Sequence, residues 1–308
     1  MTKPHADEMD IRTPNMRLAA KRWGPTNGLP VLALHGWLDN ANTFDRLAPL
    51  LPDLQLVCLD LPGHGMSDHR PAGMRYHYTD YVDEVIAVAD SLAWERFVLL
   101  GHSMGAGIGC FTASAFPDRI ARLILIEGLG AVTGDLGEVP KALRRSIEAM
   151  KFHPHKKEAA VHDLSVLVRA RAAAGNIRRS SAEILVRRAV ERRGDGFTWQ
   201  SDRRLIRPFP QYFSNEIMLA FLHGISAPVL LITAEEGTLR KRIYFRSRCD
   251  AIKDLRMVTL PGHHHLHLDD PAPVAAAVSR FLDEHEDERP MKHQSDTTLI
   301  SGSGGIDG

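Results

Sequence analysis

The sequence predicts an α/β fold with a mostly parallel, doubly wound sheet and a helical segment inserted between two core strands. Two observations carry this prediction. Short apolar runs alternate with longer amphipathic stretches over most of the 308 residues, and one long segment lacks such runs. Strand–helix–strand repetition implies right-handed crossovers, and therefore parallel strands with helices on both faces.

The apolar runs are continuous and do not alternate with polar residues, which is typical of strands that are covered on both faces. VLALH and LQLVCLDL come first, and FVLLG, RLILIE, PVLLIT and LRMVTL follow. The predicted strands are 31–35, 54–61, 97–101, 122–127, 228–233 and 255–260. The predicted helices of the core are 41–51, 79–93, 104–116 and 271–286.

Segment 131–223 interrupts this alternation and is interpreted as a helical cap over the C-terminal edge of the sheet. Residues 15–130 and 224–285 then form the core. The first 14 residues, 1–14, are expected to be flexible, and the Gly/Ser-ending segment 286–308 to be a disordered tail. The amphipathic stretches of the cap lie near 140–151, 156–173, 181–193 and 214–223.

The predicted cap is rich in paired arginines. The pairs fit either a solvated helix surface, with the aliphatic stems packed inward, or a patch for an acidic substrate or partner. They are Arg144, Arg145, Arg178, Arg179, Arg187, Arg188, Arg192, Arg193, Arg203 and Arg204.

Charge and composition argue against several classes of protein. Lys+Arg and Asp+Glu both total 38, so no net field attracts nucleic acid or anionic lipid. The N-terminus has no apolar secretory segment, and no run approaches the ~18 apolar residues of a membrane span. We expect a cytoplasmic protein whose cysteines, Cys58, Cys110 and Cys249, are free thiols.

The motif G-H-S-M-G at 101–105 follows a predicted strand and precedes a small-residue helix. A serine nucleophile on a sharp turn between strand and helix needs glycine on both sides. G-x-S-x-G by itself is a weak pattern and also fits a chance turn. Its position between strand and helix favours Ser103 as the nucleophile.

An oxyanion hole needs two N–H donors about 3 Å from the developing negative charge. One is expected from Met104, directly after the nucleophile, and the other from Trp37 in the loop after an earlier strand. Gly36 allows that loop to turn, and His35 is expected to be a structural hydrogen-bonding residue.

The segment PGHHHLHLDDP offers four histidines as the general base. Such density also suggests a metal site, but the spacing lacks the helical i, i+4 pair with an acidic residue. The segment follows a strand and precedes a helix, where a catalytic base loop is expected. We predict His264 as the base, with His263 and His265 as alternatives and His267 as structural.

The histidine needs a carboxylate that holds its tautomer and stabilises the imidazolium. Glu127 follows one predicted strand, and Glu235 and Glu236 follow another. Asp60 is better placed to brace the LPGHG turn after its own strand. On position alone, Glu127 and Glu235 remain equal candidates.

Taken together, these motifs resemble the α/β-hydrolase superfamily over residues 15–285. HGW, DLPGHGMSD, GHSMG and GHHHLHLDDP occur in the family order. The distance to Pro271 assigns the family histidine to His264, with His263 in place of the usual glycine. The segments DYVDEVIAVADSL and WERFVLLGHSMGAGIG are similar to those of bacterial serine hydrolase-like proteins.

The resemblance also bears on the acid. In the common family arrangement an aspartate stands where this chain has Gly237. Haloalkane dehalogenases have a similar glycine and carry the acid after the preceding core strand, which corresponds to Glu127 here, 24 residues after Ser103. This favours Glu127 over Glu235. Dehalogenase chemistry itself is not expected, because it uses an aspartate followed by tryptophan.

These assignments predict a serine hydrolase that cleaves a small-molecule carboxylic ester, or a related acyl bond, through an acyl-enzyme. No cofactor, metal, nucleic acid or membrane insertion is expected. Thioester or carbon–carbon hydrolysis and a haloperoxidase-like side activity would use the same residues. The alternative from another class is a catalytically weak or inactive ligand-binding protein on the same fold.

Overall fold

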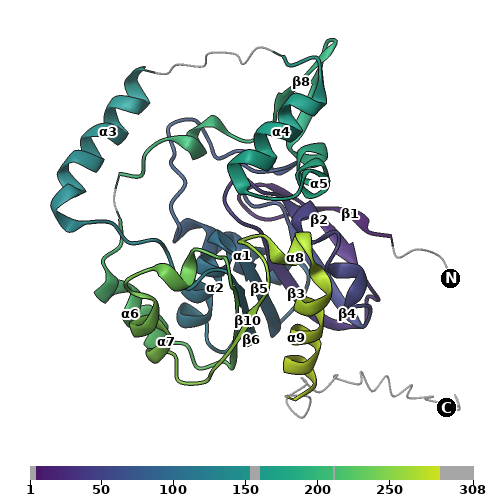
Figure 1. Cartoon of the computed structure of the whole chain (residues 1–308), viewed down its shortest axis with the longest axis vertical. Helices are drawn as coiled ribbons and strands as arrows, with labels where there is room; N and C mark the ends of the chain where they lie inside the picture. Colours follow the sequence, from purple (N-terminus) through teal and green to yellow (C-terminus); the bar gives the residue numbers. More distant parts are fainter. Residues whose placement is uncertain (1–4, 153–159, 211, 285–308) are drawn as a thin grey trace, which may run out of the picture.

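The computed structural model describes residues 5–152, 160–210 and 212–284. These residues form a central eight-stranded sheet with helices packed around it (Figure 1). The strand order is β1-β2-β4-β3-β5-β6-β9-β10. Strand β2 is antiparallel to both of its neighbours, and all other neighbouring pairs are parallel. The strands are β1 (Asp7–Arg12), β2 (Arg17–Trp23), β3 (Leu29–Leu34), β4 (Leu54–Leu59), β5 (Phe97–His102), β6 (Ile120–Ile126), β9 (Val229–Ala234) and β10 (Leu255–Leu260).

Each predicted strand corresponds to one of the parallel strands, but the N-terminal expectation was wrong. Residues 7–12, expected to be flexible, form β1 and pair with β2 along their whole length. The polar sequence DEMDIR resembles a loop, yet charged residues are common on edge strands because they discourage pairing with other chains. The predicted disordered tail, 286–308, lies outside the described residues.

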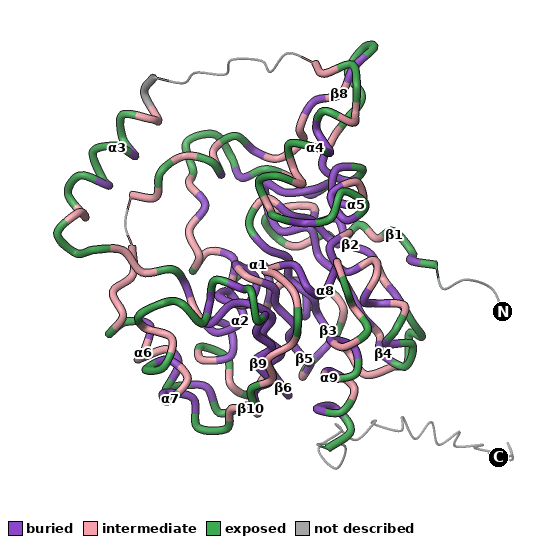
Figure 2. Tube along the Cα trace, in the orientation of Figure 1, coloured by how far each residue is buried: buried purple, intermediate pink, exposed green. Residues whose placement is uncertain are grey.

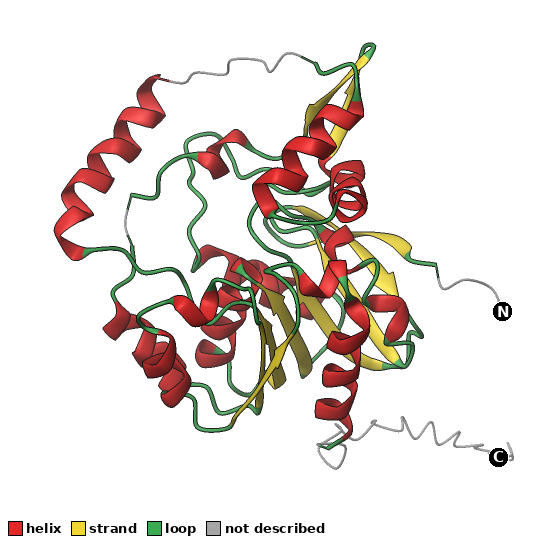
Figure 3. Cartoon of the chain, in the orientation of Figure 1, coloured by secondary structure: helices red, strands yellow, loops and turns green. Residues whose placement is uncertain are grey.

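The continuous apolar strands divide their side chains between two cores, one on each face of the sheet. Helices lie on both sides of the sheet (Figure 3). In β6, Leu123 and Leu125 contribute to one core, and Ile124 and Ile126 to the other. This is the period of two expected of a strand that is buried on both faces. The first core is covered by α1 (Asp80–Ser91), α2 (Met104–Ala115) and α6 (Asn215–His223), and the second by η1 (Ala41–Phe44), η2 (Ala48–Leu50) and α9 (Pro271–Asp283).

Three segments differ from the predicted helices. The stretch predicted near 156–173 becomes helical only at Leu164, where the Asp163 side chain caps the helix, because Val161 pairs with Phe197; its residues before 160 lie outside the described part. The stretch 41–51 forms two short 3₁₀ helices, because Pro49 lacks the N–H that a continuous helix requires. The predicted helix 181–193 ends at Ala189 and continues as a hairpin, whose turn uses Gly194 with φ +64°. The hairpin strands are β7 (Val190–Arg193) and β8 (Gly196–Trp199).

The segment between β6 and β9 is the insert, residues 131–223. It contains α3 (Val139–Phe152), α4 (Leu164–Gly175), α5 (Arg179–Ala189), the hairpin, η4 (Arg203–Ile206) and α6. In Figure 2, α3 is largely exposed, whereas α5 lies against the core. Helix α5 is tied to the loop after β3, where Asn40 Nδ2 donates to Leu185 O (2.9 Å) and Asn42 Nδ2 donates to Ile184 O (3.0 Å).

Four short helices complete the described elements: η3 (Leu136–Glu138), η5 (Leu239–Lys241), α7 (Phe245–Asp250) and α8 (Leu266–Asp269). Among the described residues, no helix combines the length and apolar character that a membrane span needs. The three cysteines are free, and burial raises the pKa of the Cys110 thiol to about 12.

Candidate active site

Ser103 lies at the sharp turn between β5 and α2, at the C-terminal edge of the sheet. Its backbone is strained, with φ +53° and ψ −109°, a region that side chains other than glycine rarely occupy. The turn is possible because two neighbours lack side chains. A Cβ at Gly105 would lie 2.2 Å from Leu34 O, and one at Gly101 would lie 2.4 Å from the Gly105 carbonyl carbon. The predicted need for glycine on both sides is therefore borne out sterically.

The serine hydroxyl, one imidazole and one carboxylate form a continuous chain of contacts. Ser103 Oγ lies 2.9 Å from His264 Nε2, and His264 Nδ1 lies 3.2 Å from Glu127 Oε2. The Glu127 side chain is fully buried, and its Oε1 accepts a hydrogen bond from the Ala234 N–H (2.8 Å). Because the carboxylate can only accept, it orients the ring with Nδ1–H toward Glu127 and leaves Nε2 able to accept from the serine.

The structure brings together Glu127 and His264, and leaves Glu235 on the surface. The reason lies at Gly237, where a Cβ would come within 2.4 Å of both Glu127 carboxylate oxygens. The Glu127 side chain occupies the space next to the bare glycine backbone. Glu127 also has a left-handed backbone, with φ +49°, directly after β6.

The four side chains of the histidine-rich loop lie in different environments. His263 is 40% exposed and faces Glu236 (Nε2–Oε2 3.7 Å), away from the serine contact made by His264. His265 is buried against Asp39 (Nε2–Oδ2 3.1 Å). His267 is fully buried beside Thr43 Oγ1 (2.9 Å). Among these four rings, His264 is the one that lies within hydrogen-bond distance of Ser103 Oγ in the described part of the chain.

A second polar cluster, which the sequence did not predict, lies next to the serine turn. His102 is buried, and its Nε2 lies 3.0 Å from His264 O, while its Nδ1 faces Asp39 Oδ2 at 3.7 Å. Arg171 of α4 donates to Asp39 Oδ1. Burial, together with the rings of His267, His265 and His264, lowers the pKa of His102 well below its ordinary value. The signal was the histidine inside GHSMG, but its partners lie far away in sequence.

Asp39 carries the negative charge of this cluster. Burial acts to raise its pKa, but His265 and Arg171 outweigh burial and hold the pKa well below its ordinary value. Asp39 is therefore a carboxylate at neutral pH. One ligand atom each of Asp39, His102 and His265 lies within 4.8 Å of the others, which is close enough to share a cation.

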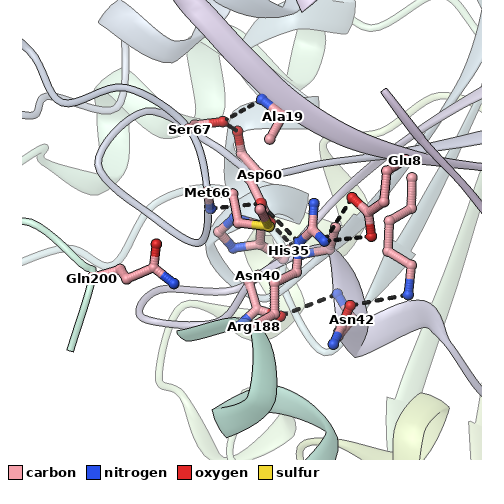
Figure 4. Close-up of polar contacts among 12 residues, drawn as sticks. Glu8, Ala19, His35, Asn40, Asn42, Asp60, Met66, Ser67, Arg188 and Gln200 are labelled. Atoms are coloured by element: carbon pink, nitrogen blue, oxygen red, sulfur yellow. Dashed lines mark hydrogen bonds and ion pairs between the residues drawn. The ribbon is translucent and has the colours of Figure 1, made fainter. Parts of the chain in front are cut away.

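Asp60 forms the other buried network beside the site (Figure 4). Its Oδ1 accepts from the Ala41 N–H (2.7 Å), and its Oδ2 accepts from the Met66 N–H and from Arg188 Nε (both 2.8 Å). Arg188, on α5, also binds Glu8 of β1 (2.8 Å). Asp60 thus braces the LPGHG turn as predicted, and also anchors the insert and the N-terminal strand.

The paired arginines of the insert therefore do not share one role. Arg188 is neither a solvated surface residue nor part of an open patch, because its side chain is only 4% exposed. Arg187 next to it is 63% exposed and pairs with Glu183, as a surface residue would. Arg204 binds Asp202 and three backbone carbonyls. The predicted structural role of His35 is supported, since its Nε2 accepts from the Leu61 N–H (3.0 Å).

A pocket opens beside the serine turn. Both predicted oxyanion residues, Trp37 and Met104, line it, together with Tyr78 and with Arg75 and Phe209. Its walls come from the core and from the insert. Three further aromatic residues of the insert do not line it: Trp199 packs against the α4–α5 cluster, Phe213 against Phe111, and Tyr212 against the pocket residue Phe209.

Comparisons with known proteins agree with this architecture. Residues 30–271 match the model of the alpha/beta hydrolase fold family. The chain is 31% identical to a serine hydrolase-like protein of Danio rerio over 95% of this chain and 93% of that protein. It is 32% identical to the human serine hydrolase-like protein 2 over 89% of this chain and 93% of that protein.

Solved structures show the same likeness. The crystal structure of the hypothetical protein PA1622 from Pseudomonas aeruginosa PAO1 is 42% identical, with a TM-score of 0.85 over 91% of this chain and 99% of that chain. A thioesterase domain from the curacin biosynthetic pathway shares the fold at 23% identity, with a TM-score of 0.79 over 90% of this chain and 99% of that chain. The chain belongs to the α/β-hydrolase family and is related to its serine hydrolase-like members.

Proposed function

We propose that the protein is a serine hydrolase that cleaves a carboxylic ester, or a related acyl bond, of a small molecule. The observation that carries the proposal is the unbroken contact chain from Ser103 Oγ through His264 to Glu127, with distances of 2.9 and 3.2 Å. In this mechanism Ser103 is the nucleophile, His264 the general base and Glu127 the group that orients the imidazole.

The first step transfers one proton and forms one bond. As Ser103 Oγ attacks the carbonyl carbon, its proton moves to His264 Nε2, and the imidazolium is stabilised by Glu127 through Nδ1–H. The same proton then goes to the leaving alcohol as the carbon–oxygen bond breaks. Water attacks the acyl-enzyme with His264 again as base, which releases the acid and restores the serine.

The negative charge of the tetrahedral intermediate requires donors that are already in position. Met104 is the first residue of α2, so its N–H is among those that a helix leaves without an internal partner. Trp37 lies on the loop after the neighbouring strand β3, and both residues line the same pocket. We assign their two N–H groups to the oxyanion hole.

The insert is proposed to act as a cap over this site. Support comes from the pocket, which is lined by core residues such as Met104 and by insert residues such as Phe209. Support also comes from the hydrogen bonds that join α5 to the loop after β3. Substrate selection would then depend on the insert, whereas bond cleavage would depend on the sheet edge.

The test combines turnover with covalent labelling. Wild type should hydrolyse p-nitrophenyl butyrate, and Ser103→Ala should lose roughly 10³-fold or more of kcat. A fluorophosphonate should add its mass to wild type, with loss of fluoride, and should not label Ser103→Ala. Ser247→Ala, which removes an exposed hydroxyl on α7, is the matched control and should behave as wild type. Equal rates in wild type and Ser103→Ala, with no adduct, would favour the non-catalytic ligand-binding alternative.

A further inference from the structure

The group formed by Asp39, His102 and His265 has no part in the proposed triad, yet it has the composition of a metal site. The three residues come from the loops or ends of β3, β5 and β10, and their side chains are 1%, 1% and 6% exposed. Asp39 Oδ2 lies 3.7 Å from His102 Nδ1 and 3.1 Å from His265 Nε2. Ligand atoms on a tetrahedral zinc ion, with bonds of about 2.0–2.2 Å, lie about 3.3–3.6 Å apart.

The proton positions leave a lone pair directed toward this point. His102 Nε2 faces a carbonyl oxygen, that of His264, and must therefore donate its hydrogen. A neutral imidazole that donates through Nε2 carries a lone pair on Nδ1. That buried atom has no hydrogen-bond partner among the described residues and faces the Asp39 carboxylate. Two electron-rich groups thus face each other, and a cation between them would satisfy both.

Gly36 keeps the space next to these atoms open. A Cβ at this position would lie 3.0 Å from His102 Nδ1 and 3.2 Å from Asp39 Oδ2. The structure balances part of the charge with Arg171 of α4, which donates to Asp39 Oδ1 and lies 3.3 Å from His265 Nε2. At 14% exposure, the Arg171 side chain is the most accessible member of the cluster.

We propose that Asp39, His102 and His265 form an inhibitory site for a transition-metal ion such as Zn²⁺, which binds in place of the Arg171 guanidinium. Two imidazoles and one carboxylate suit zinc and its neighbours and do not suit Mg²⁺, which prefers oxygen ligands. Inhibition follows from chain connectivity. His102 precedes Ser103 and His265 follows His264, so drawing both rings onto a metal pulls on the two reacting residues. The inhibitory effect rests on the proposed hydrolase function, whereas metal binding does not.

The binding test uses the full-length, chelator-treated protein and Zn²⁺ alone, measured by equilibrium dialysis with metal analysis. Wild type should bind Zn²⁺ at a single tight site. His265→Gln should weaken binding by about 100-fold or more, since loss of a direct ligand exceeds the 10–100-fold cost of losing an outer contact. His263→Gln is the matched control, because His263 is exposed and pairs with Glu236, and it should bind as wild type. Equal binding in wild type and His265→Gln, or loss of binding in His263→Gln, would overturn the proposal.

Arg171→Met gives a measurement that keeps all three ligands. Removing the competing guanidinium should tighten Zn²⁺ binding roughly tenfold or more, and weaker or unchanged binding would contradict the displacement. Co²⁺ should show the visible absorption of a nitrogen-ligated, low-coordinate ion in wild type and lose it in His265→Gln. Zn²⁺ should also slow fluorophosphonate labelling of wild type and of His263→Gln. Binding without slower labelling would refute the inhibitory role and leave the hydrolase proposal to the Ser103→Ala test.

Discussion

Two buried charge networks flank the serine turn, and they differ in the groups that surround the buried carboxylate. In each, an arginine from the insert meets a carboxylate that follows a core strand: Arg188 with Asp60, and Arg171 with Asp39. Asp60 is surrounded by backbone N–H donors, whose protons do not leave at ordinary pH. Asp39 instead faces imidazole nitrogens of His102 and His265, each of which can donate or accept a hydrogen bond or bind a metal. The first network is suited to holding structure and the second to binding a ligand.

The histidines around Ser103 belong to the second network or pack against it. The ring of His102 lies 4.8 Å from those of His264 and His265, and 4.2 Å from that of His267. A neutral imidazole has one donor and one acceptor nitrogen, and each needs a partner when the ring is buried. His102, His265 and His267 each keep a buried Nδ1 without a partner among the described residues. Arg188 Nη2 of the first network is likewise buried without a partner among the described residues, so each such atom needs its own explanation.

The largest expected effect is on catalysis at the second region. Glu127→Gln keeps the shape of the side chain but removes the charge that orients and stabilises the His264 ring, so kcat for p-nitrophenyl butyrate should fall about 10³–10⁴-fold. Glu235→Gln, on the surface after the next core strand, should leave kcat unchanged. If Glu235→Gln were the damaging variant, the acid would have been misassigned.

The next largest effect is on stability at the first region. Arg188→Met leaves Asp60 buried without its cation, and the free energy of unfolding in urea should fall by about 3–5 kcal/mol. Arg187→Met, one position earlier and mostly exposed, should change it by less than about 1 kcal/mol. Similar losses in both variants would remove the distinction between the buried network and a surface pair.

Acid should destabilise the protein through its buried histidines. Burial lowers the pKa of His64 to about 3, and burial with neighbouring rings lowers the pKa values of His102 and His267 well below 6.5. Below about pH 6.5 the unfolded chain therefore binds protons at these histidines that the folded chain does not bind. Stability should be full above pH 6.5 and fall as pH drops toward the folded-state values, by about 2 kcal/mol at pH 5 for His64 alone.

Urea unfolding at pH 7.5, 6 and 5 checks this dependence. A midpoint that stays constant or rises on acidification would contradict the neutral state of these rings. His64→Gln should make the pH dependence of the unfolding free energy shallower. The substitution removes one histidine with a lowered pKa near Asp60 and leaves the histidines around Asp39 in place.

The smallest effect should come from Arg171. Because Asp39 keeps His265 as a partner after Arg171→Met, the loss in unfolding free energy should be about 1–3 kcal/mol, below that of Arg188→Met. Arg169→Met, exposed on the same helix, is the control and should have little effect. A loss equal to that of Arg188→Met would mean that both arginines serve only to hold the insert.

Local patterns predicted the parallel core well because each strand is a continuous apolar run. The same patterns failed for β1, whose polar sequence pairs only because β2 is beside it. They also placed the helix after β3 incorrectly, since one proline divides 41–51 into two 3₁₀ helices. Periodicity could not assign the paired arginines, because Arg187 and Arg188 differ only in the direction in which α5 presents them.

By itself, the sequence determined which residues could react and at which strand ends they would lie. Glycines around Ser103 and apolar runs on both sides are local features, and local features follow from backbone sterics and burial. Only the tertiary structure decided the partners. Glu127 meets His264 because a missing side chain at Gly237 leaves it room. Asp39, His102 and His265 meet because three segments distant in sequence come together at one sheet edge, where α4 adds Arg171. Contacts of that kind depend on the packing of several elements at once, which no single stretch of chain encodes.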